Sequence, residues 1–341
     1  MSSGSERHGS LRLGTVAGGL IGLGLCAWLL ASYGIVRIVD VLAHAGWTGT
    51  AVIIAFHFPQ MLCSAFGWRV IVGSGGPGAA RPGLGAYLRL RWIREAVNNL
   101  LPLAQIGGEL VVVRLLQLRA VPLAAAIAGT TADLTLEIAT QVLFTLLGVL
   151  LLFQAGADSA LATMILESLL VAALLIVALF VALWLGLAVV IERSLLRLGR
   201  SFGWPATARI GGLHAALMRC YRAPGRVLGA SFWHLLSWLL GGLEVCLILH
   251  FLGEDVDLTT GLILESLGQA AKALGFAVPG AVGVQEGGYV VIARVLGISP
   301  ELALALSLMK RLREVVLGLP GLALWHRAEA RVAVAPTASI T

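Results

Sequence analysis

Several charged side chains lie inside long apolar runs of this chain, where an unpaired charge is expensive. Asp133 and Glu137 are one helical turn apart in one run. Lys310, Arg313 and Glu314 lie together in another. A charge at the centre of a membrane costs about 2.5–3.5 kcal/mol on insertion scales, so such residues normally face a partner or a water-filled cavity. We therefore predict a salt bridge between Asp133 and Lys310. A second is predicted between Glu137 and Arg313. These charges are interpreted either as a static ionic lock or as a midplane gate or proton-coupled switch on a substrate pathway.

Two further acidic residues, Glu109 and Glu286, stand next to pairs of glycines in apolar segments. Glycine permits tight turns, and a neighbouring carboxylate can accept bonds from exposed backbone N–H groups or bind a cationic head group or ion. Either each Glu caps its bend, or both line the pathway of the charges above. The residues expected to break the helices here are Pro102, Gly107, Gly108, Pro279, Gly280, Gly287 and Gly288.

Arg91, Arg94 and Asn98 share one face of a helix predicted just before the first of these breaks. Guanidinium groups suit phosphate because their fork of N–H donors binds two oxygens at once. This face is therefore a candidate site for a phospholipid head group. The alternative is that these arginines, with the neighbouring Trp92, are anchors at the membrane interface.

Other polar residues in apolar runs are expected to have structural roles. Glu244 and Glu265 lie nearer the ends of their runs, where a long side chain can reach the interface. His57 and His234 are expected to be core or interfacial residues. The four cysteines are scattered without metal-ligand or disulfide spacing, so neither a metal site nor a cofactor is predicted.

The composition indicates an integral membrane protein. Of the 341 residues, 58% are hydrophobic and only 12% charged, whereas soluble domains carry about a quarter charged residues. A soluble enzyme is excluded on this basis. The net charge of +6 does not indicate nucleic acid, because the basic residues follow a membrane topology.

Six apolar runs are long enough to cross a membrane as helices. Two other segments, 84–119 and 258–297, are apolar but interrupted by proline and glycine. Because freed backbone groups find no water in the hydrocarbon layer, such breaks are tolerated only inside protein or beside a wet cavity. We interpret both segments as re-entrant helical hairpins. The six predicted crossings are 13–33, 49–72, 123–153, 161–190, 226–252 and 301–325.

The distribution of basic residues supports this count. With six crossings and a cytoplasmic N-terminus, 17 of the 24 Lys and Arg fall on the cytoplasmic side and three on the other. Many of them lie in an Arg-rich loop at about 191–226. The fold class predicted is therefore an all-α, single polytopic membrane domain over 1–341 with both termini cytoplasmic.

An internal repeat appears when the chain is shifted by 177 residues. The shift places His57 on His234, Glu109 on Glu286, and Asp133 on Lys310, among others. The two repeats cover about 51–140 and 228–317. Each is predicted to consist of a membrane crossing, a re-entrant hairpin and a second crossing. An odd number of crossings separates them, so the repeat is predicted to have inverted topology. Secondary transporters built in this way place their site near the bilayer midplane. The alternative is an old duplication kept for packing alone.

Several ordered motifs resemble a known family. They run from Val97 to Glu109, then Asp133-Leu134-Thr135, Val278-Pro279-Gly280, Gln285 to Tyr289, and Leu308 to Glu314. Together they resemble the flippase-like membrane domain of lysylphosphatidylglycerol synthases, and within it most nearly the hopanoid-biosynthesis-associated membrane proteins. The resemblance covers nearly the whole chain. It implies an inner-membrane protein of bacteria that moves a lipid or its head group between leaflets.

The function predicted is a lipid flippase or transporter, with anionic phospholipid or hopanoid as cargo. Its pathway is expected to be lined by the midplane charges with Glu109 and Glu286. The chain ends without the soluble aminoacyl-transfer domain of the full synthases, so no enzyme activity is expected. Two alternatives stay open, namely an integral-membrane transferase acting on a lipid-linked substrate and a non-catalytic subunit that positions hopanoid-pathway proteins. The sequence does not indicate an oligomeric state.

Overall fold

The computed structural model describes residues 35–72, 82–101, 107–155, 212–275, 278 and 281–333. Over these residues the protein is helical, without strands. The helices are α2 (Ile35–Val72), α3 (Leu84–Leu100), α4 (Gly107–Gln117), α5 (Leu123–Gln154), α8 (Leu213–Tyr221), α9 (Pro224–Phe251), α10 (Leu258–Leu274), α11 (Val284–Val295) and α12 (Pro300–Ala333).

Three of the described helices are long and apolar enough to cross a membrane: Ala43–Val72 within α2, Leu123–Gln154 and Pro224–Phe251. They correspond to the predicted crossings 49–72, 123–153 and 226–252. The predicted crossing 301–325 lies within α12, which has 34 residues but a lower mean hydropathy because it carries several charges. The predicted crossings 13–33 and 161–190 lie outside the described residues.

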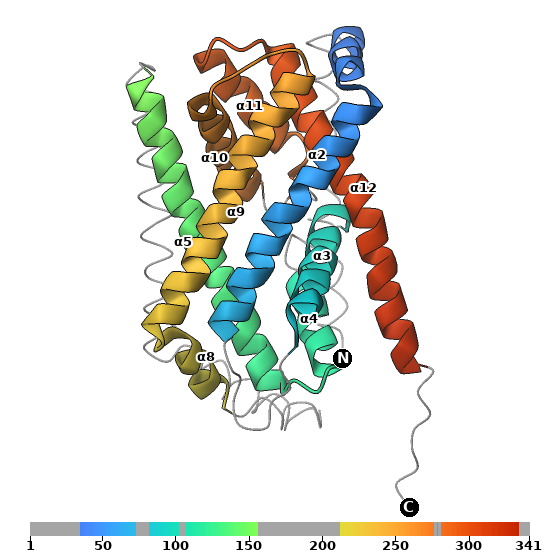
Figure 1. Cartoon of the computed structure of the whole chain (residues 1–341), viewed down its shortest axis with the longest axis vertical. Helices are drawn as coiled ribbons and strands as arrows, with labels where there is room; N and C mark the ends of the chain where they lie inside the picture. The colour runs from blue at the N-terminus through green and yellow to red at the C-terminus, as the bar shows by residue number, and fades with distance from the viewer. Residues whose placement is uncertain are drawn as a thin grey trace, which may run out of the picture.

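The helices form two sets with the same order of lengths, a long helix, two short helices and a long helix. The first set is α2 to α5 and the second is α9 to α12. The long helices α2 and α9 pack along each other, and each set packs its first short helix against the last helix of the other, α3 on α12 and α10 on α5. The short pairs lie at opposite ends of the bundle (Figure 1).

Each predicted hairpin segment contains a pair of helices. Helix α3 ends at Leu100 and α4 begins at Gly107, and these two helices pack together. Helix α10 ends at Leu274 and α11 begins at Val284, again in contact. Pro102, Pro279 and Gly280 lie outside the described residues, between the helices that they were predicted to interrupt.

Gly108, Gly287 and Gly288 were assigned to the breaks but lie inside helices, so the prediction is wrong for these three, while Gly107 is the first residue of α4. Gly108 and Gly288 permit close packing of helices. A Cβ at Gly108 would lie 2.5 Å from the carbonyl oxygen of Arg94, so α4 approaches α3 only because residue 108 has no side chain. A Cβ at Gly288 would collide in the same way with Ala271 of α10. The glycines concerned are Gly107 and Gly108 at the start of α4 and Gly287 and Gly288 in α11.

Two apolar cores lie between the helices. One centres on α2, α3, α4, the start of α5 and α8, with Trp68 and Leu90 fully buried. The other joins α9 to α12 with the end of α5, and includes Ile248 and Leu304. Polar and charged residues between these cores form the site described below.

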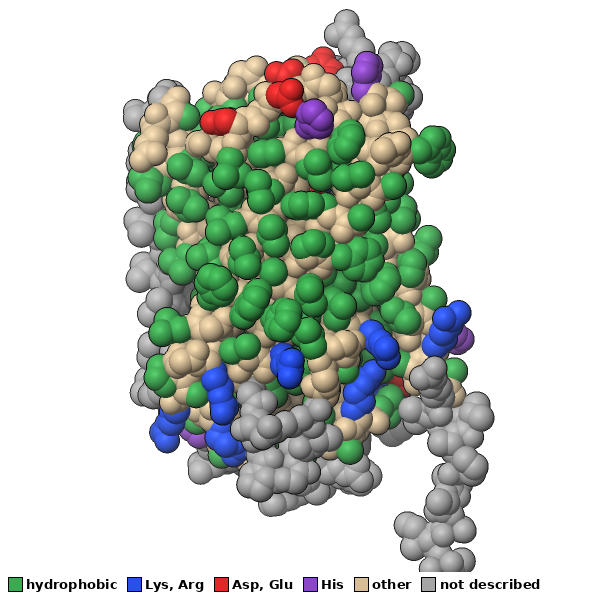
Figure 2. Space-filling view, in the orientation of Figure 1, with side chains coloured by type: hydrophobic (Ala, Val, Ile, Leu, Met, Phe, Trp, Pro, Cys, Tyr) green, Lys and Arg blue, Asp and Glu red, His purple; other side chains and the backbone are tan. Residues whose placement is uncertain are grey.

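Charge divides the surface into three zones. In Figure 2 an apolar belt separates an end rich in Lys and Arg from an end rich in Asp and Glu. Arg219 and Arg222 are exposed at the α8 end, and the turn between α9 and α10 carries exposed Glu254 and Asp255 at the other. An apolar belt between two charged ends is the pattern of a membrane-embedded bundle.

Candidate functional site

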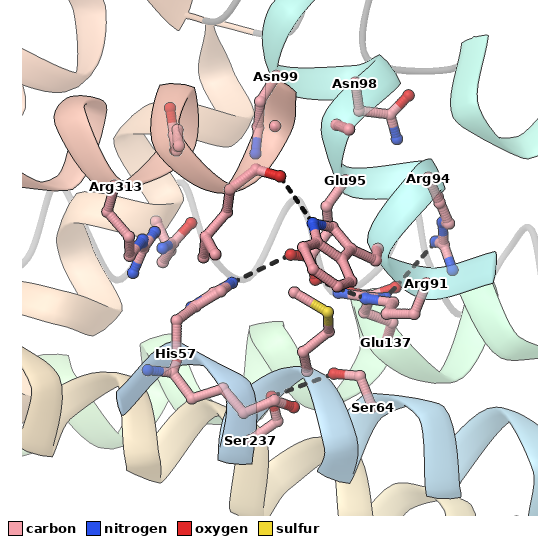
Figure 3. Close-up of a pocket in the computed structure, with 18 of the residues that line it drawn as sticks. His57, Ser64, Arg91, Arg94, Glu95, Asn98, Asn99, Glu137, Ser237 and Arg313 are labelled. Carbon is pink, nitrogen blue, oxygen red and sulfur yellow. Dashed lines mark hydrogen bonds and ion pairs between the residues drawn. The ribbon is translucent and has the colours of Figure 1, made fainter. Parts of the chain in front are cut away.

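A cavity of about 210 Å³ lies between the two helix sets, and we call it the central cavity. Its polar lining is unusual for a protein with an apolar surface belt, since four Lys or Arg and four Glu border it. Figure 3 shows Arg91 and Arg94 on one side and Arg313 on the other. The lining comprises His57, Gln60, Met61 and Ser64 of α2; Arg91, Trp92, Arg94, Glu95, Ala96, Asn98 and Asn99 of α3; Glu137 of α5; Ser237 and Trp238 of α9; Glu265, Gln269 and Lys272 of α10; and Arg313, Glu314, Leu317 and Gly318 of α12.

Arg94 is the centre of the ion pairs in the first set. Its Nε donates to Glu109 at 2.8 Å, its Nη1 to Asp133 at 2.7 Å and its Nη2 to Glu137 at 2.9 Å. The side chain is only 4% exposed, so this cation is held by carboxylates from α4 and α5 rather than by water. Arg94 thus ties the short helices of the first set to α5.

Arg91, one turn earlier on α3, completes this network. It binds Glu137 through two parallel bonds, Nη1 to Oε2 at 2.8 Å and Nη2 to Oε1 at 2.5 Å. Its Nε donates to Glu95 at 2.7 Å. Two guanidinium groups therefore share Glu137, a charge-assisted arrangement that fixes the orientation of all three side chains.

The second set carries its own ion pairs. Lys310 binds Glu265 of α10, and Arg313 binds Glu244 of α9. Both carboxylates are buried, with 3% and 0% of their side chains exposed. Glu314 accepts from Lys272 at 2.6 Å, so α10 is tied to α12 at a second point.

Arg311 extends the pairing in the second set to α11. It donates to Glu286 at 3.1 Å and to Glu314 at 3.0 Å. Glu286 also accepts the backbone N–H of Gly283 at 2.6 Å and so caps α11. The capping interpretation of Glu286 is confirmed, and Glu109 instead pairs with Arg94 and Asn98.

The predicted bridges from Asp133 to Lys310 and from Glu137 to Arg313 are wrong. Asp133 and Glu137 bind arginines of α3, while Lys310 and Arg313 bind glutamates of α10 and α9. The physical reason is that each of these four residues has a partner of opposite charge within reach in its own helix set. The sequence suggested a phosphate face or interfacial anchors for Arg91 and Arg94, and an interfacial position for Glu244 and Glu265. The signal that could have found them is their position within apolar runs, the same signal that marked Asp133 and Lys310.

The face of α3 that was predicted to bind phosphate, with Arg91, Arg94 and Asn98, is already occupied by bonds within the protein. Each nitrogen of Arg94 and of Arg91 already donates to a carboxylate. Asn98 accepts the backbone N–H of Gly108 at 2.7 Å, so its role is to hold the first turn of α4 against α3. These residues organise the central cavity, and the interfacial-anchor alternative fails as well because Arg94 is buried.

Two histidines that were expected to be structural lie in this network. His57 contacts Glu95 with 3.0 Å between Nε2 and Oε2, and His234 contacts Asp133 with 3.0 Å between Nε2 and Oδ1. Their matching positions in the repeat were visible in the sequence, but their carboxylate partners were not.

Several contacts between the two sets at the central cavity involve a neutral polar group. Gln60 of α2 donates to Glu244 at 2.8 Å, and Ser64 donates to Ser237 at 3.1 Å. The indole N–H of Trp92 donates to the carbonyl oxygen of Leu317 at 2.7 Å. Over the described ranges, no group of three or more His, Cys, Asp or Glu has an arrangement suited to a metal ion.

These features define the class of the protein. Long apolar helices, a belt of apolar surface (Figure 2) and a charged cavity between two helix sets are features of an integral membrane protein. Residues 15–321 match the family described as the lysylphosphatidylglycerol synthase TM region, and the chain belongs to that family. It is therefore related to membrane proteins that handle or modify lipids. Comparison with curated proteins gave no significant match. Comparison with solved structures gave none either.

Proposed function

We propose that the protein translocates a lipid between the leaflets of a membrane, with the polar head group passing through the central cavity. The observation that carries the proposal is a polar, charge-lined cavity between two helix sets whose outer surface is apolar. An unpaired polar group in hydrocarbon costs several kcal/mol, and a polar path beside the bundle avoids that cost. The acyl or ring portion of the lipid stays outside in the membrane.

The arrangement of the two helix sets supports an inverted-topology repeat with six crossings. The sets share the order long, short, short, long, their short pairs lie at opposite ends, and their cross-contacts are equivalent. In transporters of this design, one half rocks against the other around a fixed site. The proposed orientation places the basic end and both termini in the cytoplasm of a bacterial cell, with the protein in the inner membrane.

The ion pairs favour such a motion. Every pair that a buried Lys or Arg makes in the central network joins helices of the same set. In the central cavity the sets instead meet through the bond from Gln60 to Glu244, through the hydroxyl and carbonyl bonds of Ser64 and Trp92, and through the contact of His234 with Asp133. One exposed ion pair, Arg114 with Glu329, also joins the sets at the surface. Rocking would therefore leave the lysines and arginines of the central network paired. We propose that these ion pairs hold the helices of each half together.

The proposed cargo is a membrane lipid with a polar head group, either a phospholipid or a hopanoid. The hopanoid rests on the motif resemblance alone. Gln60, Asn99 and Gln269 supply amide groups, and Ser64 a hydroxyl group, at the cavity wall. Because every nitrogen of Arg91 and Arg94 donates to a carboxylate, we propose that these neutral groups make the first contacts with the head group on that side of the cavity.

A reconstitution experiment tests the proposal. Purified protein is placed in liposomes containing a fluorescent lipid whose outer-leaflet fraction is bleached, so that the bleached fraction reports exchange between leaflets. Gln269→Cys introduces a thiol at the cavity wall, and Leu243→Cys introduces one at an exposed apolar position of α9. Both thiols are modified only after the protein has folded. We expect a bulky thiol reagent to abolish lipid exchange between leaflets in Gln269→Cys but not in Leu243→Cys. Wild-type protein treated with the same reagent is the control for modification of the native cysteines.

Two outcomes would contradict the proposal. Exchange no faster than in protein-free liposomes, for phospholipid and hopanoid probes alike, would remove the translocator function. Formation of a new lipid product by the purified protein would instead favour the transferase.

A further inference from the structure

A second cavity lies at the basic end of the bundle, and we call it the basic-end cavity. Its volume is about 670 Å³, so it is larger than the central cavity, and the two have no described lining residue in common. It lies beside α8, where α2 ends and where α5 and α9 begin, and α8 packs against these three helices. Figure 1 shows α8 at this end of the bundle. The cavity is therefore a different site from the one proposed for a crossing head group.

The described wall of the basic-end cavity carries arginines without acidic neighbours. Arg219 of α8, Arg222 at the end of α8 and Arg226 of α9 line it, and no described lining residue is acidic. In the central cavity, by contrast, every lining Lys or Arg is paired with a glutamate. Among the described residues, Arg219 and Arg226 have no such partner. Two guanidinium groups at this cavity are thus free to bind an anion.

Arg219 and Arg226 lie close enough together to act on the same group. Burial raises the pKa of the Cys220 thiol, and the charges of both arginines partly oppose that rise. Cys220 lines the cavity together with them. Like charges around one small volume repel each other, and an anion between them would replace that repulsion with attraction.

The helix ends hold these arginines in place. Helix α8 ends at Tyr221 and α9 begins at Pro224, so a short turn brings Arg219 and Arg226 to the same space. The hydroxyl of Tyr221 donates to the hydroxyl of Thr135 at 3.1 Å, which fixes the end of α8 against α5. A site carried by regular helices is preorganised, because few groups lose freedom when a ligand binds.

The rest of the described wall is largely apolar. Val72 of α2, Ala125 of α5 and Met218 of α8 belong to it. A Cβ at Gly129 would lie 2.8 Å from Cγ2 of Val72, so α5 and α2 meet closely at this wall. A pair of cations beside an apolar wall suits a ligand that has an anionic group and an apolar part.

The cavity lies at the edge of the apolar belt. Val72, Leu123 and Pro224 are terminal residues of the three helices that are long and apolar enough to cross a membrane. Figure 2 shows Lys and Arg side chains gathered where the belt ends. The phosphate groups of a bilayer lie just outside its hydrocarbon layer, and basic pockets between transmembrane helices bind anionic head groups there. The cavity therefore stands at the depth at which a phospholipid presents its phosphate.

We propose that the basic-end cavity binds an anionic phospholipid, with its phosphate on Arg219 and Arg226 and its apolar part along Val72 and Met218. A guanidinium group suits phosphate because two of its N–H donors can bind two oxygens at once. A soluble phosphate would leave the apolar wall exposed to water, whereas a phospholipid covers it. The bound lipid ties α8 to the ends of α2, α5 and α9. This lipid is distinct from the transported one, so the proposal does not rest on translocation.

Native mass spectrometry of the full-length protein in a neutral detergent tests the proposal. The probes are phosphatidylglycerol and phosphatidylcholine with the same palmitoyl and oleoyl chains, so only the head group differs. We expect the first phosphatidylglycerol to bind at least about fivefold more tightly, since one basic residue near an anionic lipid contributes about that factor. The preference should weaken as the ammonium acetate concentration rises, because salt screens the charges. Equal affinity for the two lipids would overturn the proposal.

Substitution of the two arginines tests the assigned site. Arg219→Gln combined with Arg226→Gln should weaken phosphatidylglycerol binding at least about tenfold and leave phosphatidylcholine binding unchanged. The matched control is Arg69→Gln, because Arg69 is an exposed arginine in the last turn of α2 that does not line the cavity. The control should change the affinity by less than about twofold. Arg219→Lys combined with Arg226→Lys keeps both charges and should retain most of the preference.

Two results would overturn this assignment. One is unchanged phosphatidylglycerol affinity in the double Gln variant, and the other is an equal loss in the Arg69→Gln control.

Photocrosslinking locates the lipid without any substitution. A phosphatidylglycerol with a diazirine in its head group should label α8 and the first turn of α9, and an excess of inorganic phosphate should not displace it. Label concentrated around Arg89 and Arg327, which line a third cavity, would overturn the location. Displacement by inorganic phosphate would indicate a site for a soluble anion and overturn the phospholipid. None of these measurements depends on lipid exchange between leaflets, so failure of the proposed function and failure of this proposal are distinguishable.

Discussion

The pairing of Lys310 with Glu265 allows a decisive test of the network. Both side chains are only 3% exposed, so replacing Lys310 with Met leaves a buried glutamate without its cation. Removing one partner of a buried ion pair costs about 3–5 kcal/mol. We therefore expect the variant to shift the unfolding equilibrium at least about a hundredfold, since 1.4 kcal/mol corresponds to a factor of ten.

A second substitution should restore most of this loss. Glu265→Gln removes the unpaired charge and keeps one oxygen, which can still accept from Gln269 at the site of the present 2.8 Å bond; its amide N–H can donate to the hydroxyl of Tyr289, which now donates to the other oxygen at 3.4 Å. Lys310→Met combined with Glu265→Gln is expected to be within about 1.5 kcal/mol of wild type, because well-packed neutral groups can replace a buried ion pair at little cost. Unfolding can be followed by tryptophan fluorescence in detergent with increasing denaturant.

The matched control is Lys310→Met combined with Asp133→Asn, the partner that the sequence suggested. Asp133 binds Arg94 and His234 instead, so the two losses should add. Rescue by the Asp133 substitution, or a cost below about 1 kcal/mol for Lys310→Met, would refute the structural assignment.

Other predictions follow from the backbone and from one helix end. Gly108→Ala should destabilise the protein by about 1–3 kcal/mol, because the new Cβ meets the backbone oxygen of Arg94. Gly287→Ala should be tolerated, because the space around Gly287 is open. Thermal unfolding of the two variants tests both expectations. Asp257 caps α10 by accepting the N–H of Thr260 at 2.9 Å, and Asp257→Ala should lose about 1 kcal/mol at neutral pH. Hydrogen bonds from Thr260 lower the pKa of Asp257 in the folded protein. The difference in unfolding free energy between wild type and Asp257→Ala should therefore be largest above the pKa that Asp257 has in the unfolded chain. It should vanish as the pH falls through the lower pKa of the folded protein. A difference that persists unchanged in acid would contradict the capping role.

Much of the helical plan can be predicted from hydropathy and helix breakers. The runs at 123–153 and 226–252 correspond to α5 and α9, and the interrupted segments are pairs of helices, because an apolar stretch without a backbone partner must be helical in lipid. Pro102 and Pro279 fall between helices, whereas Pro59 and Pro320 lie inside α2 and α12. The glycines do not distinguish a break from a close helix contact, since both need a residue without a side chain, and Gly108 and Gly288 serve the second purpose.

The site is predicted only in part. Burial of Asp133 and Lys310 follows from the cost of exposing a charge to lipid, and the structure confirms it. Their partners cannot be predicted in this way, because any opposite charge nearby would lower the cost of burial equally well. Which charge is nearby depends on how helices far apart in the chain pack together. Glu265 precedes Lys310 by 45 residues, on a different helix. No local pattern encodes that contact.

The central claim is that the cavity between the helix sets receives a lipid head group. An electron cryo-microscopy map of the protein in nanodiscs of native lipid, at a resolution that shows side chains, measures this most directly. We expect head-group density among Gln60, Asn99 and Gln269, continuous with a tail that leaves the bundle between helices. Ordered lipid around the apolar belt together with a cavity that contains only water would contradict the account.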